Sequence, residues 1–235
     1  MTCSTAPWPT AASASQAPDR PERRAGRATP SHSTLCIEGY SSGRLVPSPD
    51  GREALAETAG HVPVELSEMA DGVRFQGGHD GYVRTFGLTH ARTLELAFDG
   101  RGMAGEDMLL AMDAAAKRRF DKAMDSVQLA GIGFDIRLHL HSDVDATLDL
   151  GGAAVSMALK SGEIWVFRHD GQADLALEPS VYLENGRLKP RASRQIVLSG
   201  RATDYATRVR WSLSKAHETA VAVRDLARDE PVFEN

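Results

Sequence analysis

The chain of 235 residues contains only two cysteines, Cys3 and Cys36. Two cysteines cannot form the disulfide framework that stabilises small secreted domains. Cys3 also lies in a segment that we expect to be disordered, which argues against a bridge between the two. No run of apolar residues reaches the roughly 18 residues of a membrane-spanning helix. The sequence therefore predicts neither a disulfide scaffold nor a membrane span.

Aromatic residues are also scarce, at 6% of the chain, which argues against a surface that binds sugars mainly by ring stacking. The 27 basic residues are outnumbered by 32 acidic ones, and the formal net charge is −5. This balance gives no overall attraction for nucleic acid or for an anionic membrane. Hydrophobic residues make up 42% of the chain, which is enough for the core of one domain.

The first 28 residues differ in composition from the rest, because Ala, Ser, Thr, Pro and Arg dominate them. Such a segment buries too little apolar surface to offset the entropy lost on ordering. We expect residues 1–28 to be a disordered tail, or to result from a shifted reading frame or a wrong start. We expect residues 216–235 to be a second tail. No signal peptide is evident, so the sequence does not establish the localisation.

Turn-forming pairs recur along the rest of the chain, and strand-length segments lie between them. Asp-Gly or Asn-Gly stands at 50–51, 71–72, 80–81, 99–100, 170–171 and 185–186. In residues 134–141, apolar side chains alternate with polar ones, as expected for a half-buried strand. Residues 164–167 are apolar throughout and should be covered on both faces. The pattern predicts an all-β fold of stacked antiparallel sheets, a β-sandwich.

One segment has helical periodicity instead. Between residues 110 and 127, Met112, Ala116, Phe120 and Met124 recur every four positions, which predicts a short helical insertion between two strands. A further helical turn is expected at Glu53–Glu57.

Several motifs, in the same order along the chain, resemble a known family. The segment Thr29–Ile37 resembles the Ala-x-x-His-(Ser/Asn)-Thr signature of heparinase II/III-like polysaccharide lyases. Further similar stretches are His79–Tyr82, Leu88–Leu94, Gly105–Asp107, Arg137–His141, Ile164–Phe167, Glu178–Tyr182 and Gln195–Leu198. Together they cover residues 28–213, and we take residues 29–215 as the C-terminal β-sheet domain of this family.

The resemblance implies a function for the whole protein. Members of the family join an N-terminal α/α toroid to this β-domain and cleave uronate-containing polysaccharides by β-elimination, with Tyr and His transferring the protons. The Tyr and a key His come from the toroid, so no catalytic residue is assigned to this chain. The implied partners are an acidic polysaccharide and the toroid domain. The family often acts in the bacterial cell envelope or periplasm.

The resemblance also implies a metal ligand. His32 occupies the position of a histidine that binds a structural zinc in the family. A structural zinc needs about four ligands, and the other family ligands lie upstream of the signature. We therefore expect no firm cofactor for this chain, and a loop histidine held by hydrogen bonds is the alternative interpretation of His32.

Four residues are candidates for substrate binding. His79 and Tyr82 flank an Asp-Gly turn and could reach a sugar, or they could pack at a hairpin corner. His90 and Arg92 share one strand face with Leu94, so they could line a groove for a polyanion or be partly buried.

Two other functions stay open. The chain could be a non-catalytic module that binds acidic glycan or docks to a partner protein. Alternatively, His139 and His141 project from one strand face, with Asp145 nearby, in a pattern similar to a cupin metal site.

Overall fold

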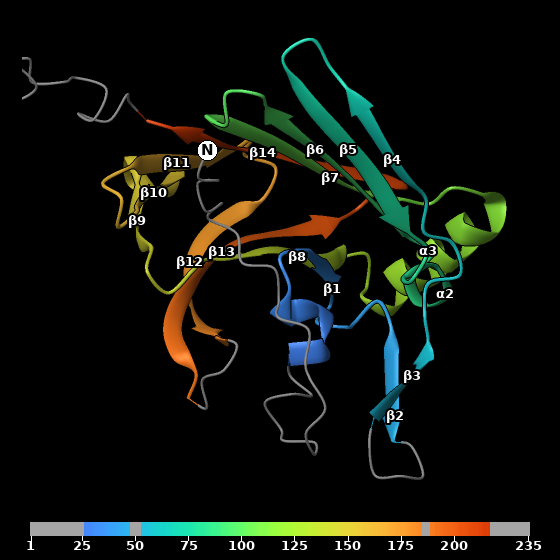
Figure 1. Ribbon diagram of the computed structural model, residues 1–235. Helices are drawn as coiled ribbons and strands as arrows, with labels where there is room; N and C mark the ends of the chain where they lie inside the picture. Colours follow the sequence, from blue (N-terminus) through green and yellow to red (C-terminus); the bar gives the residue numbers. More distant parts are fainter. Residues whose placement is uncertain (1–25, 48–52, 185–188, 217–235) are drawn as a thin grey trace, which may run out of the picture.

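A computed structural model describes residues 26–47, 53–184 and 189–216, and within them most of the chain forms two stacked antiparallel sheets (Figure 1). The large sheet has eight strands in the order β4-β5-β6-β7-β14-β11-β10-β9. These strands are β4 (Val64–Glu68), β5 (Gly72–His79), β6 (Thr89–Ala97), β7 (Gly102–Leu110), β14 (Ala206–Lys215), β11 (Ile164–His169), β10 (Ala154–Ala158) and β9 (Asp145–Asp149).

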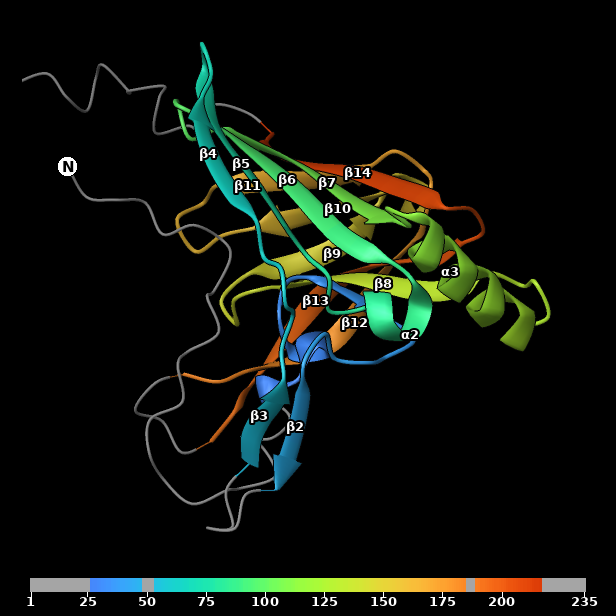
Figure 2. The same cartoon turned by 90° about the vertical axis from the view of Figure 1, so that its right-hand side faces the viewer.

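The small sheet has four strands in the order β1-β8-β13-β12 and lies against the concave face of the large one (Figures 1 and 2). Its strands are β1 (Leu35–Ile37), β8 (Ile132–His139), β13 (Arg191–Ala202) and β12 (Asp174–Tyr182). A separate hairpin consists of β2 (Arg44–Pro47) and β3 (Glu53–Glu57), and two short 3-10 helices are η1 (Thr29–Ser31) and η2 (Leu150–Gly152). The prediction of an all-β fold with stacked antiparallel sheets is confirmed.

The core forms where the inward-facing rows of the two sheets meet. In β8, Phe134, Ile136 and Leu138 are each at most 3% exposed, so the alternation predicted for this strand is confirmed. In the large sheet, the Trp211 ring of β14 stacks on Phe167 of β11 with ring centroids 5.9 Å apart. Burial of these apolar faces is the main favourable contribution to folding.

Two helices close one end of the sandwich, α2 (Val83–Phe86) and α3 (Ala114–Ser126) (Figure 2). The helix α3 lies between β7 and β8, which confirms the predicted helical insertion. It begins at Asp113, whose carboxylate accepts the N–H of Ala116 at 2.7 Å. Ala116, Phe120 and Met124 are buried, whereas Met112 precedes the helix and is 68% exposed.

The two helices approach closely because α2 ends at a glycine. Gly87 has a φ of +69°, and a Cβ at this position would lie 2.1 Å from the carbonyl oxygen of Ala116. A residue with a side chain would therefore push α3 away from α2.

Two sequence-based predictions of local structure are wrong. Glu53–Glu57 forms strand β3 rather than a helical turn, because it pairs with β2 and the pairing overrides a weak helix preference. The segment 164–167 is not covered on both faces. Trp165 and Phe167 face the core, but Ile164 is 50% exposed, because no segment of the described residues packs on the outer face of β11. The tails expected at 1–28 and 216–235 lie almost entirely outside the described residues.

Candidate functional site

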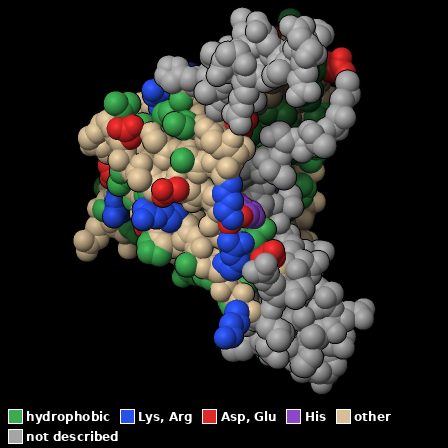
Figure 3. Space-filling model, turned by 60° about the vertical axis from the view of Figure 1, so that its left-hand side comes forward, with side chains coloured by type: hydrophobic (Ala, Val, Ile, Leu, Met, Phe, Trp, Pro, Cys, Tyr) green, Lys and Arg blue, Asp and Glu red, His purple; other side chains and the backbone are tan. Residues whose placement is uncertain are grey.

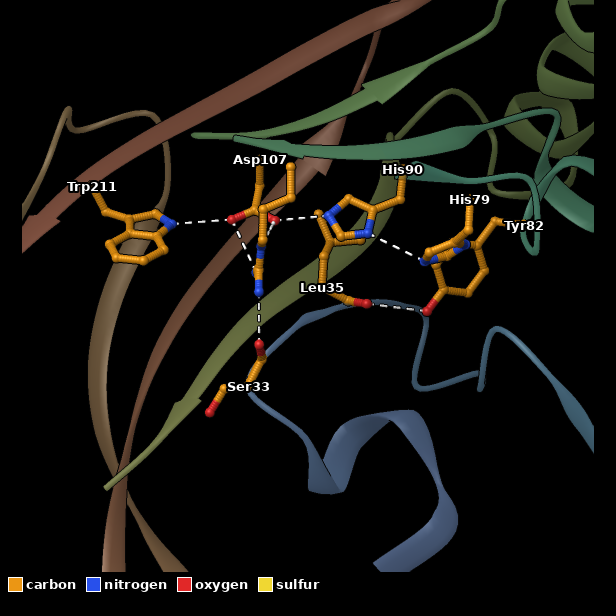
Figure 4. Close-up of polar contacts among 8 residues, drawn as sticks. Ser33, Leu35, His79, Tyr82, His90, Asp107 and Trp211 are labelled. Atoms are coloured by element: carbon orange, nitrogen blue, oxygen red, sulfur yellow. Dashed lines mark hydrogen bonds and ion pairs between the residues drawn. The ribbon is translucent and has the colours of Figure 1, made fainter. Parts of the chain in front are cut away.

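Three of the candidate substrate-binding residues, His79, Tyr82 and His90, lie together in the interior between the two sheets (Figure 4), and Arg92 joins them through its hydrogen bond to Asp107. His79 ends β5 and pairs across the sheet with His90 of β6, and Arg92 follows on the same face. Tyr82 lies in the turn between β5 and α2. His90 is 3% exposed and Tyr82 is 1% exposed, so neither side chain can reach a polysaccharide.

A buried carboxylate, Asp107 of β7, is at the centre of the cluster. Its side chain is fully buried and accepts four hydrogen bonds. His90 Nε2 donates to Oδ1 at 2.7 Å, and Arg92 donates from Nε to Oδ1 at 2.8 Å and from Nη2 to Oδ2 at 3.1 Å. The indole N–H of Trp211 donates to Oδ2 at 3.0 Å. The bidentate guanidinium compensates the cost of burying the negative charge.

These contacts explain the ionisation of Asp107. Burial acts to raise the pKa of a carboxyl group, but the Arg92 guanidinium and the His90 hydrogen bond stabilise the ionised form by more. The pKa of Asp107 is therefore held well below its ordinary value.

The two histidines form a directed chain of hydrogen bonds that ends at Asp107. Because the carboxylate can only accept, His90 must carry a proton on Nε2. His79 Nε2 lies 3.3 Å from His90 Nδ1, and the N–H of Gly81 lies 3.3 Å from His79 Nδ1. A neutral His79 with its proton on Nε2 satisfies every one of these contacts. Burial, together with nearby His90, lowers the pKa of His79 to about 4, which agrees with a neutral ring.

The cluster also binds the backbone of the segment just before and within β1. Arg92 Nη1 donates to the carbonyl oxygen of Ser33 at 2.7 Å, and the Tyr82 hydroxyl donates to that of Leu35 at 3.1 Å. Burial raises the pKa of the Tyr82 phenol well above its ordinary value of 10.0. Two residues predicted to bind substrate therefore satisfy backbone carbonyls of the chain itself, which would otherwise be costly to bury.

His32 does not lie within a complete metal site. It follows η1, and its N–H donates to the carbonyl oxygen of Thr29 at 3.0 Å. Within residues 26–47, 53–184 and 189–216, no three His, Cys, Asp or Glu side chains are arranged to hold a metal ion. A structural zinc requires about four ligands. The residues present therefore do not fit a zinc ion around His32 without ligands from elsewhere.

The cupin-like pair is not arranged for metal binding either. His139 Nδ1 lies 2.8 Å from Ser180 Oγ, and its Nε2 lies 3.0 Å from the carbonyl oxygen of Pro30. Both ring nitrogens thus have protein partners. The His141 ring packs against Tyr182 with centroids 4.6 Å apart. The two histidines are held in separate local contacts.

An open groove of about 590 Å³ lies at one end of the small sheet, and none of the four candidates lines it. Its polar side chains are Glu38, Asp135, Gln172, Asp174, Ser199 and Arg201. Three carboxylates and one guanidinium make the groove acidic, which disfavours an acidic glycan.

The sequence of residues 8–212 matches the family described as "Heparinase II/III-like, C-terminal". The match includes the β1 segment, the His79–His90–Asp107 chain and both sheets, except for the last three residues of β14. The chain belongs to this family. The match begins within the segment that we expected to be a tail. The resemblance inferred from the short motifs is confirmed.

A relative of this heparinase II/III-like domain is "FtsZ-localized protein C" of Caulobacter vibrioides (strain NA1000 / CB15N). It is 30% identical over 208 residues, which cover 85% of this chain and 34% of the relative. The chain therefore spans about a third of the length of the curated relative that it matches.

Solved structures share the fold at low identity. Heparan sulfate lyase HepC from Pedobacter heparinus has a TM-score of 0.60 at 11% identity, over 84% of this chain and 26% of that one. The heparinase III described as the BT4657 gene product has a TM-score of 0.63 at 11% identity, over 91% and 28%. No helix in the described part of this domain has the length and apolar character needed to cross a membrane.

Asp107→Asn should lower the free energy of unfolding by about 3–5 kcal/mol, because it leaves the Arg92 charge buried without its counter-ion. Urea denaturation followed by circular dichroism measures the loss. The adjacent Glu106 is a matched control, since it pairs with the exposed Arg210 at 2.8 Å. Glu106→Gln should cost only about 0–1 kcal/mol. Equal losses for the two variants would contradict the central role of Asp107.

The stability of the domain should fall as the pH drops from about 6.5 to about 4. In this window unfolded His79, with an ordinary pKa of 6.5, takes up a proton, whereas folded His79 with a pKa of about 4 does not. This contribution is fully present above pH 6.5. His79→Gln can still donate to His90 but cannot titrate, so its Tm should fall less between pH 7 and pH 4.5. Identical pH dependence of Tm in both proteins would rule out this role of His79.

Proposed function

We propose that this chain is the β-domain of a heparinase II/III-like protein, and that it contributes one wall of a cleft for acidic polysaccharide but no catalytic group. The observation that carries the proposal is the complete use of its candidate His, Tyr and Arg side chains in the buried Asp107 cluster. In the whole protein, the proton transfer of β-elimination then falls to an α/α toroid domain.

The chemistry of β-elimination supports this division. The reaction needs a base that reaches the proton beside the uronate carboxyl group, and an acid at the leaving oxygen. Both ring nitrogens of His79 and His90 are engaged in hydrogen bonds. The Tyr82 hydroxyl donates to a carbonyl, and its raised pKa keeps it protonated at neutral pH. None of these groups can reach or accept a substrate proton without breaking the core.

Surface charge supports contact with an acidic glycan. Figure 3 shows Lys and Arg side chains in a strip on one face of the molecule, with acidic and His side chains among them. In a surface group near β12 and β13, Lys160 and Arg191 both pair with Asp143. The His141 and Tyr182 rings, which pack edge to face, lie beside it. Guanidinium and ammonium groups bind carboxylate and sulfate, so we place glycan contact at this Asp143 group.

The purified chain should form no unsaturated uronate from heparan sulfate or alginate, as measured by ultraviolet absorbance, yet it should be retained on an acidic-glycan column and elute with salt. Lys160→Glu should elute at lower salt. Lys117→Glu, an equal change of charge on the exposed face of α3, is the matched control and should shift elution less. Product formation would contradict the absence of a catalytic group. A wild-type chain that the column does not retain would contradict the proposed contact with acidic glycan.

A second candidate is a module that docks at an assembly of FtsZ. The name of the relative from Caulobacter vibrioides and the 30% identity over 85% of this chain favour it. The exposed apolar side chains of β4 also favour a protein partner, since such patches mark interaction sites.

Under the docking hypothesis, the purified chain should sediment with GTP-assembled FtsZ polymers from Caulobacter vibrioides and stay in the supernatant when GDP prevents assembly. Under the glycan hypothesis, it should stay in the supernatant in both cases. Bovine serum albumin at the same concentration measures trapping. Sedimentation that does not depend on GTP would count against docking to the polymer.

A further inference from the structure

The large sheet extends beyond the small one, and the β4–β5 hairpin projects past it (Figure 1). On the face that continues the core, Leu66 of β4 lies opposite Phe75 of β5, and Phe75 lies opposite Leu94 of β6. Leu66 is 68% exposed, and Val64 on the same strand face is 60% exposed. The projecting end thus offers an apolar row that nothing in the described chain covers.

Strand β4 is also an edge strand, and half of its backbone groups face away from the sheet. Pro63 accepts the N–H of Gly78 of β5, and the N–H of Met69 donates to Gly72. Because the direction of these groups alternates along a strand, residues 65 and 67 face β5 while Val64, Leu66 and Glu68 direct their N–H and C=O groups outward. Among the described residues, no strand pairs with this side of β4.

We propose that β4 pairs with β4 of a second copy of this chain, antiparallel and centred on Leu66, so that two large sheets join into one. In this register Leu66 lies opposite its own counterpart, and Val64 lies opposite Glu68 of the other copy. Glu65 then lies opposite Ser67 of the other copy. The outward groups of three residues on each strand form about six hydrogen bonds across the two-fold axis.

The charges of β4 fit this register. Glu65 and Glu68 would discourage pairing with an acidic strand, but in the two-fold arrangement neither lies opposite another acid. Ser67 lies opposite Arg74 within its own copy, so Glu65 of the second copy continues the row Arg74–Ser67. Arg74 itself pairs with Glu95 of β6 at 2.8 Å, so the joined sheets would carry a row of Glu95, Arg74, Ser67 and Glu65 with no two acids adjacent.

The opposite edge of the same sheet shows what an edge that opposes self-pairing looks like. Strand β9 runs from Asp145 to Asp149, and antiparallel pairing centred on Thr147 would place Asp145 opposite Asp149 twice. Like charges directly opposite each other are destabilising. The small-sheet edge at β1 is closed in another way, because Tyr82 caps the carbonyl of Leu35 and Arg92 caps that of Ser33 just before the strand. Of these three edges, only β4 has neither a side-chain cap nor an acid–acid pair when two copies pair about the middle residue of the strand.

Sedimentation equilibrium of the full 235-residue chain, from low to high micromolar concentration, tests the proposal. The chain should show a reversible monomer–dimer equilibrium. Leu66→Lys places two charges face to face and should raise the dissociation constant by at least about tenfold. Leu148→Lys on β9 is the matched control, since Leu148 is 49% exposed on the other edge, and it should leave the dimer unchanged. A chain that stays monomeric, or a dimer weakened equally by both variants, would overturn the proposal.

A charge reversal tests the register. Ser67→Glu places acid opposite Glu65 at two symmetric positions and should weaken the dimer. Adding Glu65→Lys to that variant restores an opposite-charge pair at both positions and should recover dimerisation. Circular dichroism of each variant verifies that the monomer is folded. Failure of the double variant to recover, with folding intact, would overturn the register centred on Leu66.

Discussion

The structure depends on one buried charge. A carboxylate in the interior is stable only if cations and hydrogen-bond donors surround it, and Asp107 of β7 accepts from donors on the two strands that flank it, β6 and β14. Arg92 uses its remaining Nη1 to hold the carbonyl of Ser33. The requirement to neutralise one charge thereby fixes the large sheet and the entry to β1 relative to each other. The small sheet begins at β1, so its position follows as well.

The same residue types would suit a lyase active site, and the difference lies in access rather than in composition. A catalytic His or Tyr needs a free nitrogen or oxygen directed at the substrate. In this cluster the N–H groups of Gly81, His79 and His90 each donate to the next group, and the chain of hydrogen bonds ends at Asp107. A fully satisfied buried network is rigid, which favours a supporting role for the domain. Membership of the heparinase II/III-like family therefore does not by itself place proton-transfer chemistry in this chain.

The period-two patterns of the sequence were sufficient to predict the sheets. They give the buried row of β8, and they place His90 and Arg92 on the face of Leu94. The spacing of α3 predicted its buried stripe. Predictions failed where pairing partners decide the outcome, because residues 53–57 form a strand only in the presence of β2. An apolar run such as 164–167 does not reveal which of its faces has a neighbouring layer.

These sequence patterns do not predict which residues contact Asp107. Adjacent strand residues point to opposite faces, so the separation of Asp107 from half-buried Glu106 on the outer face could be predicted. The partners of Asp107, however, lie 15 positions away at Arg92 and 104 positions away at Trp211. No local periodicity encodes the order of strands that brings β6, β7 and β14 together. The candidate residues could thus be found from the sequence, but the buried carboxylate that changes their role required the sheet topology.

The edge strands of the sheets face a similar constraint, because their outward backbone N–H and C=O groups also need partners. The chain closes the edge of β1 with side chains and places acids at both ends of β9. An edge strand without such protection is a liability in a monomer, because its unpaired groups accept any compatible strand. The alternation of Val64, Glu65, Leu66, Ser67 and Glu68 on β4 avoids acid–acid pairs in one symmetric register. This edge therefore suits pairing with a second copy. A single acid in place of Ser67 would have been enough to oppose that pairing.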